Sequence, residues 1–377
     1  MGPADQDWEA KSLDNLDPAD LQLVANFLNE QFPGVFYPAC SPEIFIWKLG
    51  LENPAGPGFI TAAFHRGKVI GVFTLTRKNF VINGHKIAAG EIGDAFTHPQ
   101  FRRGGKCISP SEYLAQNDDY FNKSIFGRLV AETLFRARLD GVQFVYGTPN
   151  AIAKPSYLKR LGFAEFSKGR IYSKYLLTKQ YEVQILLSLL VKSLTLINHL
   201  YSKTFTRLHY GRNAITEISS TEILSELHLE NQLPKFRTNE IIMIVDKQYI
   251  LNRYVNHPLL KYRFFRVNSK ARTLGYIIGT EILRASGIRT LVISDWIALE
   301  PEFSDKFNLF LGCLRSFSGN AGTISLWQGK KTPKLSLLAS GVFSAKEVSI
   351  VVKSLDNKID LNDLNFFDFH FGWSDNG

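Results

Sequence analysis

A basic, glycine-rich loop is the part of the sequence best suited to chemistry. Residues 96–106 read FTHPQFRRGGK. Gly104 and Gly105 let backbone N–H groups approach phosphate oxygens closely, and a helix N-terminus after the loop would add a favourable dipole. Three cations add positive charge at the same place, namely Arg102, Arg103 and Lys106. The loop therefore predicts a pyrophosphate site, and a purely structural surface turn is the alternative.

The elements around this loop are predicted from apolar spacing and turn signals. A helix is expected to begin at Asp17-Pro18. Strands are expected at 58–65, 69–77 and 87–96, with a hairpin turn at Asn83-Gly84. An amphipathic helix at 125–139 and an apolar strand at 142–146 follow. This order predicts an α/β domain with a mixed sheet.

The second half of the chain resembles a degenerate repeat of the first. Residues 66–72 are similar to 270–276, and residues 92–96 are similar to 293–297. These matches pair Gly71 with Gly275 and Asp94 with Asp295, at offsets of 204 and 201 residues. A further match, of 161–163 with 340–343, has a smaller offset, which fits a first-half insertion at 107–124. We therefore predict two domains, at 1–178 and 212–377.

A strongly apolar stretch at 181–210 is expected to form the helical linker, placed at 179–211. Glu182, Lys192 and His199 interrupt it, so it falls short of a membrane-spanning segment. An interdomain helix is the favoured interpretation, and an interfacial membrane helix, which would make the protein a membrane-associated scaffold, is the alternative.

Composition limits the location and the partners. The chain has 377 residues and is 45% hydrophobic, so it can bury a substantial core. Its three cysteines are widely spaced and form no disulfide or CxxC pattern, which favours a reducing cytoplasm and no metal site. The net charge of +9 indicates an anionic partner. Because no zinc finger, RNP-like motif or long basic run is present, we expect a phosphate-rich cofactor or substrate and no nucleic acid.

In their order, these features resemble the GNAT acyltransferases. In that family a fourth strand runs into an Arg-x-x-Gly-x-Gly/Ala loop, then a helix, then a strand ending near an Asn. Here 102–105 (RRGG) supplies the start of the loop motif, and 124–129 (SIFGRL) supplies its remaining glycine beyond the insertion. Residues 146–150 (YGTPN) and 157–163 (YLKRLGF) match the last motif. The resemblance covers residues 15 to 175.

The resemblance implies tandem GNAT-like domains, each a twisted, mostly antiparallel mixed sheet flanked by helices. It also implies an N-acyltransferase in which a primary amine directly attacks the thioester of acetyl-CoA or another acyl-CoA. Amides around Gly104, Gly105 and Gly127 would hold the pyrophosphate, and the pantetheine arm would pair with Phe96 and Thr97. Further cofactor contacts are expected from Arg102, Arg103, Lys106, Phe126, Arg128 and Asn150.

A carboxylate or a water chain must take the proton of the attacking amine. Glu91 and Asp94 are expected on one strand, three residues apart, so they should face opposite sides and only one can reach the cleft. Asp94 is favoured because Asp295 occupies the matching repeat position. Anchoring the acceptor ammonium, or a structural role, is the alternative for either carboxylate.

The family often places a tyrosine acid four residues before the glycine of the last motif. That position is Leu158 here, so the neighbouring Tyr157 is the candidate for protonating the thiolate, with water as the alternative. His98 abuts the turn proline and is expected to cap the loop.

The acceptor is expected to be a nucleotide-linked amino sugar. Tandem GNAT proteins that acylate such sugars for surface polysaccharides are similar to this chain in its NHP element at 256–258 and its closing aromatic strand. A dTDP-linked 3-amino-3,6-dideoxyhexose is the specific prediction, with an acetyl or a short acyl group such as hydroxybutanoyl. The second domain, with Glu302 and Asp305 where phosphates would lie, should not bind CoA but should contribute to acceptor binding. Expected acceptor contacts are Phe36, Tyr37, Trp296, Trp373 and Asp375.

Other functions stay open at this point. A peptide or an aminoglycoside could supply the amine, or the protein could bind acyl-CoA without turnover. The oligomeric state is left open by the sequence.

Overall fold

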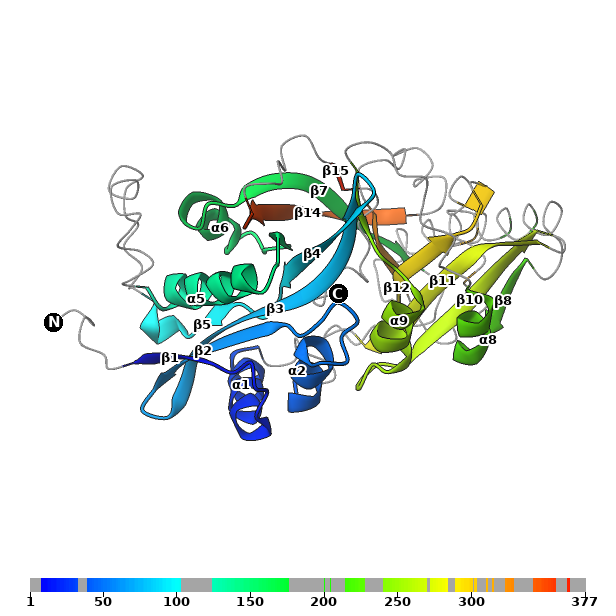
Figure 1. Cartoon of the computed structure of the whole chain (residues 1–377). Helices are drawn as coiled ribbons and strands as arrows, with labels where there is room; N and C mark the ends of the chain where they lie inside the picture. The colour runs from blue at the N-terminus through cyan, green and yellow to red at the C-terminus, as the bar shows by residue number, and fades with distance from the viewer. Residues whose placement is uncertain are drawn as a thin grey trace.

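In the computed structural model of the chain, the two halves of the molecule join edge to edge in one twisted sheet that carries helices on its faces (Figure 1). The structure describes residues 8–32, 39–102, 124–175, 200, 204, 214–227, 240–269, 272–283, 289–300, 302–303, 310, 314, 323–328, 342–356 and 365–366. This architecture confirms the predicted α/β class.

The first half is built around an antiparallel meander. Its strands are β1 (Glu9–Ser12), β2 (Phe59–His65), β3 (Lys68–Ile82) and β4 (His85–Ile92). A two-residue strand, β5 (Phe96–Thr97), pairs again with β3, and β6 (Phe144–Gly147) runs parallel to β4. Helices α1 (Pro18–Gln31) and α2 (Pro42–Leu49) cover one face, and α5 (Ile125–Leu139) covers the other (Figure 1).

Local chemistry explains why these elements form where the sequence predicts them. Asp17 caps α1 by accepting hydrogen bonds from the backbone N–H groups of Ala19 and Asp20. Asn83 and Gly84 have φ values of 49° and 82°, which a tight hairpin turn requires. Alternation along β3 sends Phe73 and Leu75 into the core under α5, while Val72 packs toward α1 and α2.

The two halves exchange strands at the centre of the sheet. The strand order is β1-β2-β3-β4-β6-β14-β7-β13-β12-β11-β10-β8. Thus β14 (Val342–Ser354), from the end of the chain, lies between β6 and β7 (Ala164–Tyr175). In return, β7 lies between β14 and β13 (Thr323–Gln328). Each half therefore completes the sheet of the other, which the sequence did not predict.

The second half repeats the pairing of the first. Strands β8 (Ile215–Ile218), β10 (Tyr262–Ser269), β11 (Arg272–Leu283) and β12 (Arg289–Ala298) form an antiparallel set, and β12 runs parallel to β13. Gly275 of β11 lies opposite Ala298, as Gly71 of β3 lies opposite Thr97. The register thus reproduces the predicted offsets of 204 and 201 residues.

Smaller elements complete the described chain. They are η1 (Pro99–Phe101), α6 (Lys154–Arg160), α8 (Ser220–Glu226), β9 (Glu240–Met243), α9 (Lys247–Ile250), the π-helix η3 (Leu251–Val255) and β15 (Asn365–Phe366). Strand β9 pairs with the far end of β3 and so ties the halves together a second time. Most of the predicted linker at 179–211 and of the aromatic strand near the end of the chain lies outside the described residues. Within the described part of the chain, no helix is long and apolar enough to cross a membrane.

Candidate functional site

The sheet splits open beside β5. Strands β4 and β6 are paired at three positions, the last of which joins Glu91 to Tyr146. Beyond that point β5 stays on β3, whereas β6 ends at Gly147 and the chain turns away. Among the described residues, no pairing joins β5 to β6, and we call this break in the pairing, between Thr97 and residues 147–150, the opening.

One backbone donor faces this opening. His98 donates its N–H to the carbonyl of Ile70 over 2.8 Å. Since alternate residues of an antiparallel strand point toward and away from the partner, the N–H of Thr97 points away from β3. The carbonyl of Thr97 accepts a 2.8 Å bond from Arg102 Nε. An extended ligand could thus add to β5 as a further strand.

Asp94 lies on a bulge between β4 and β5. Its backbone N–H donates to Thr74 Oγ1 over 2.8 Å, and the Thr74 hydroxyl donates to Asp94 Oδ2 over 3.2 Å. Asp94 also forms an ion pair with Lys48 of α2. The side chains of Lys48 and Asp94 are only 4% and 8% exposed, so this ion pair is almost fully removed from water.

A second buried ion pair lies next to the first. Glu91 Oε2 lies 3.5 Å from Lys78 Nζ, and both side chains are buried. Thr74 and Lys78 are four residues apart on β3 and therefore share a face of the sheet. Because Asp94 contacts Thr74 and Glu91 contacts Lys78, both carboxylates lie on this face. The prediction that they face opposite sides is wrong, because the bulge at 93–95 breaks the alternation.

Two buried ion pairs on one strand face are energetically unusual. The desolvation of each charge offsets most of the attraction within a pair, so a hydrophobic replacement is often as stable. Charges kept buried at this cost are candidates for a role other than stability. Their position beside the opening makes the face of Thr74, Thr76 and Lys78 the candidate active site.

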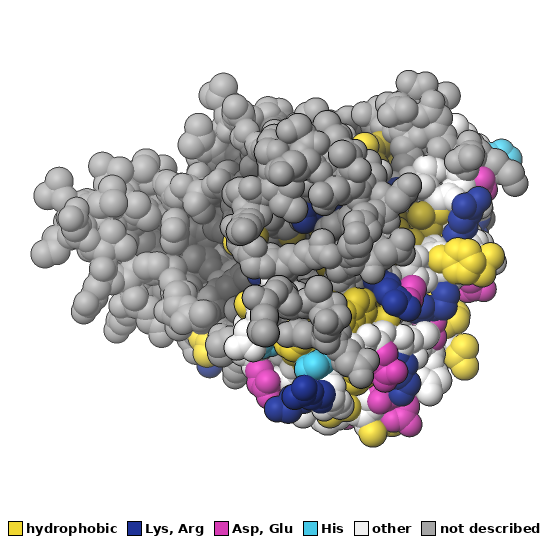
Figure 2. All heavy atoms as spheres, turned by 90° about the vertical axis from the view of Figure 1, so that its left-hand side faces the viewer, with side chains coloured by type: hydrophobic (Ala, Val, Ile, Leu, Met, Phe, Trp, Pro, Cys, Tyr) yellow, Lys and Arg dark blue, Asp and Glu magenta, His cyan; other side chains and the backbone are white. Residues whose placement is uncertain are grey.

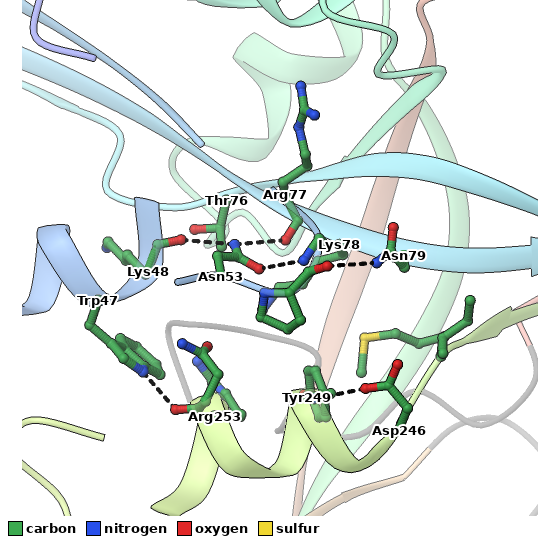
Figure 3. A pocket seen from close by; sticks show the side chains of 15 residues that line it. Trp47, Lys48, Asn53, Thr76, Arg77, Lys78, Asn79, Asp246, Tyr249 and Arg253 are labelled. Carbon is green, nitrogen blue, oxygen red and sulfur yellow. Dashed lines mark hydrogen bonds between the residues drawn. The ribbon is translucent and has the colours of Figure 1, made fainter. Parts of the chain in front are cut away.

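A small cavity continues this site toward the second half. It lies between α2, β3 and the α9–η3 segment, and has a volume of about 20 Å³ (Figure 3). Thr76 and Lys78 line it from the first half. Asp246 and Arg253 line it from the second.

The helices on either side of the cavity are joined by Trp47. Its indole Nε1 donates to the carbonyl of Asn252 in the π-helix over 2.7 Å (Figure 3). The guanidinium of Arg253 lies 5.2 Å from the Trp47 ring centre, and the His257 ring lies 4.4 Å away. Since Lys48 follows Trp47 directly, the second half helps to hold the helix that carries the partner of Asp94.

Comparison with known proteins assigns the first half. Residues 12–166 match the family model described as an acetyltransferase (GNAT) domain. Residues 12–166 form a GNAT acetyltransferase domain. Acyl-CoA-dependent N-acyltransfer is the activity of such domains, so this match supports the prediction of an acyl-CoA-dependent N-acyltransferase.

Solved structures share the fold over most of the chain. N-myristoyltransferase of Saccharomyces cerevisiae, with bound myristoyl-CoA and inhibitors, aligns over 92% of this chain and 79% of its own, at 13% identity and a TM-score of 0.56. A probable N-acyltransferase of Enterococcus faecalis aligns over 93% and 73%, at 15% identity and a TM-score of 0.53. A GCN5-related N-acetyltransferase of Anabaena variabilis aligns over 92% and 72%, at 14% identity and a TM-score of 0.52. No curated protein matches the sequence.

The GNAT domain places the predicted cofactor residues in different settings. Phe96 and Thr97 lie at the opening, and the guanidinium of Arg102 stacks over the Phe96 ring at 4.7 Å. The N–H of Gly127 donates to Ser124 Oγ over 2.9 Å, so the structure uses this amide to cap α5, not to face a phosphate. Arg103, Gly104, Gly105 and Lys106 lie outside the described residues.

Three further cofactor candidates have partners within the protein. The ring of Phe126 packs edge-on against Phe73 and Tyr157 in the core. Arg128 pairs with Glu132 one helical turn away. Asn150 Oδ1 accepts from the N–H groups of residues 152 and 153 and so caps the turn before α6.

Tyr157 is held in the core of the GNAT domain. Its side chain is buried between Phe126 and Phe163, with ring centres 5.9 and 5.2 Å away. His98 Nδ1 accepts from the N–H of Gln100, which confirms its predicted capping role.

The predicted acceptor residues are not brought together in the described structure. Trp296 lies on β12 and packs against the apolar core of the second half. Phe36, Tyr37, Trp373 and Asp375 lie outside the described residues. On the face shown in Figure 2, basic and acidic side chains intermingle among the described residues. That part of the surface therefore lacks the one-sided basic patch typical of nucleic-acid binding.

The sequence analysis missed Lys48, Thr74, Thr76 and Lys78. A signal for three of them is visible in residues 73–78 (FTLTRK), where polar residues alternate with apolar ones in a strand covered on both faces. Such alternation indicates polar side chains in a place where water is excluded. In the described residues, no group of His, Cys, Asp and Glu side chains could hold a metal ion.

Proposed function

We propose that the protein transfers an acyl group from acyl-CoA to the primary amine of a nucleotide-linked amino sugar. The observation that carries this proposal is the buried Lys48–Asp94 ion pair beside the opening in the sheet, next to a cavity that both halves line. A cytoplasmic location and a role in surface polysaccharide synthesis belong to the same proposal.

The GNAT domain offers groups that fit an acyl-CoA. The outward N–H of Thr97 suits a pantetheine arm that adds to β5 as a strand. The first turn of α5 begins beside β5 and provides a helix N-terminus without an acidic residue, which suits a pyrophosphate. Bound there, acyl-CoA supplies the activated thioester that an amine can attack.

The chemistry then requires a proton acceptor. The amine nitrogen forms a bond to the thioester carbonyl carbon, the C–S bond breaks, and CoA leaves as a thiolate. Asp94 takes the proton that the nitrogen loses, directly or through a water. Its ion pair with Lys48 and its bonds to Thr74 fix the orientation of the carboxylate.

Charge favours an anionic acceptor over a polycationic one. The net charge of +9 favours an anionic acceptor such as a nucleotide diphosphate over a polycationic aminoglycoside. We place the catalytic domain at 1–178 and the acceptor-binding half at 212–377, with 179–211 as the linker.

A long-chain acyl donor is a second candidate. The fold likeness to an N-myristoyltransferase with bound myristoyl-CoA favours it. Because that likeness is one of fold, the donor must be decided by assay.

The test is a thiol-release assay with acetyl-, hydroxybutanoyl- and myristoyl-CoA. Each donor is offered dTDP- and UDP-linked amino sugars, a peptide with a free N-terminus, and an aminoglycoside. We expect turnover with a nucleotide-linked amino sugar. Turnover with the peptide or aminoglycoside alone would reject the sugar proposal, and CoA binding without turnover toward any amine would indicate a non-catalytic binding module.

A further inference from the structure

The cavity between the halves contains a buried hydroxyl group without a hydrogen-bond partner. Thr76 lines the cavity and is only 2% exposed, and its Oγ1 is buried. Within the described structure, no hydrogen bond is made by this oxygen. A buried hydroxyl is expected to find a partner, because leaving it unpaired is unfavourable. The partner must therefore come from whatever enters the cavity.

The size of the cavity limits what that partner can be. Its volume of about 20 Å³ accommodates one water-sized group. A single hydroxyl group matches this volume and can both donate to and accept from Thr76 Oγ1.

The cavity lies close to the carboxylates of Glu91 and Asp94. Thr74, which holds Asp94, precedes Thr76 by two residues on the same strand face, a spacing of about 7 Å between the Cα atoms. Glu91 lies directly opposite Thr76 on β4. A hydroxyl bound to Thr76 would therefore place a neighbouring substituent of the same sugar ring near the two carboxylates.

We propose that this cavity binds a hydroxyl group of the acceptor, carried by the carbon next to the one that bears the amine. This inference rests on the proposed function and names a recognition element of the same site. Thr76 is then a specificity-determining residue that contacts the acceptor. A site built to bond a hydroxyl discriminates strongly against an analogue that lacks it.

The test compares matched acceptors with matched variants. The acceptors are dTDP-3-amino-3,6-dideoxyhexose and its 2-deoxy and 4-deoxy analogues, and kcat/KM is measured for each. With the wild-type enzyme, kcat/KM for one of the two analogues should be lower by about 100-fold or more than for the parent sugar. With Thr76→Val, kcat/KM for the acceptor that bears both hydroxyls should fall by a similar factor. The values of kcat/KM for this acceptor and for the discriminated analogue should then differ by about threefold or less. The KM for acyl-CoA should not change.

Two further variants separate recognition from packing. Thr216→Val removes another buried hydroxyl without a partner, on β8 of the second half, and should leave all rates unchanged. Thr76→Ser keeps the hydroxyl and should retain the discrimination. If Thr76→Val acylates all three sugars as the wild type does, the inference is overturned while the proposed function stands. If no nucleotide-linked amino sugar is acylated and only other amines, such as that of the peptide, are acylated, the inference and the proposed function are both overturned.

Discussion

Glu91 and Asp94 lie on the same face of the sheet although three residues separate them. The bulge at 93–95 returns Asp94 to the side that Glu91 already faces. Each carboxylate meets a lysine there, Lys78 for Glu91 and Lys48 for Asp94. One strand face thus carries two carboxylates, and a carboxylate within reach of the attacking amine is the group that the proposed proton removal needs.

Asp94→Asn should lower kcat by about 100- to 10,000-fold, because the amide cannot accept the amine proton. The affinity for CoA should stay the same, since Asp94 lies off the strand edge that would bind pantetheine. Steady-state kinetics and calorimetry with CoA measure the two effects. Asp20→Asn, which alters the surface pair of Asp20 with Lys11, is the matched control and should behave as the wild type. Unchanged turnover in Asp94→Asn would remove this residue from the mechanism.

Lys48→Met should destabilise the protein by about 3–5 kcal/mol, because it leaves the Asp94 carboxylate buried without its charge partner. The double variant Lys48→Met/Asp94→Leu should be more stable than the single variant, since no buried charge remains. Urea unfolding at constant pH measures both free energies. Lys11→Met at the surface is the control and should cost less than about 1 kcal/mol. A Lys48→Met variant as stable as this control would mean that the pair is not buried in solution.

A similar arrangement recurs in the second half, with different chemistry. Asp295 follows the bulge of β12 as Asp94 follows β4, but it accepts a 2.9 Å hydrogen bond from the Tyr254 hydroxyl. Burial, followed by the charge of Asp295, raises the pKa of Tyr254 well above its usual value. Tyr254 therefore stays neutral, and the second half holds its aspartate with a neutral donor where the first half uses a lysine.

Cys40 should be unreactive at neutral pH. Burial, and then the charge of Asp94, raise the pKa of its thiol to about 12. At pH 8 only about one thiol in 10,000 is then the reactive thiolate, so iodoacetamide should label Cys40 far more slowly than the urea-unfolded chain. Peptide mass spectrometry measures the rate at this site, and Asp94→Asn should speed it up. Fast labelling of the native protein would contradict the raised pKa of this partly buried thiol.

The same shift predicts a pH dependence of stability. Because the folded state holds the thiol proton more tightly than the unfolded state, the contribution is complete below about pH 9 and is lost as the pH rises toward about 12. Cys40→Ser should therefore lose less stability than the wild type over this range, as measured by urea unfolding between pH 8.5 and 11.

Sequence reasoning worked best where the signal is local. The cap at Asp17, the turn at Asn83-Gly84 and the helix α5 follow from short-range chemistry and match the structure. The Lys48–Asp94 pair joins residues 46 positions apart, and no local pattern encodes it. The bulge at 93–95 also escaped prediction, because it depends on how β3 pairs with both β4 and β5.

The strand exchange predicts that the first half cannot fold alone. A fragment ending at residue 178 lacks β14, which pairs with β6 on one side and β7 on the other. It also lacks Lys353, whose ammonium donates to the carbonyl of Leu161 over 2.5 Å and lies 5.8 Å from the Phe163 ring centre. The fragment would expose unpaired strand edges, so we expect it to aggregate.

Co-expression provides the sharpest form of this experiment. Residues 1–178 and 179–377, produced together as separate chains, should assemble into a soluble complex, because each supplies the strand that the other lacks. The intact protein should likewise unfold in one cooperative transition when it is followed by circular dichroism. A fragment 1–178 that is soluble and binds CoA by itself would contradict the exchange. It would mean that β7 can return to β6 within the first half, and that the central pairing of β14 contributes little to stability.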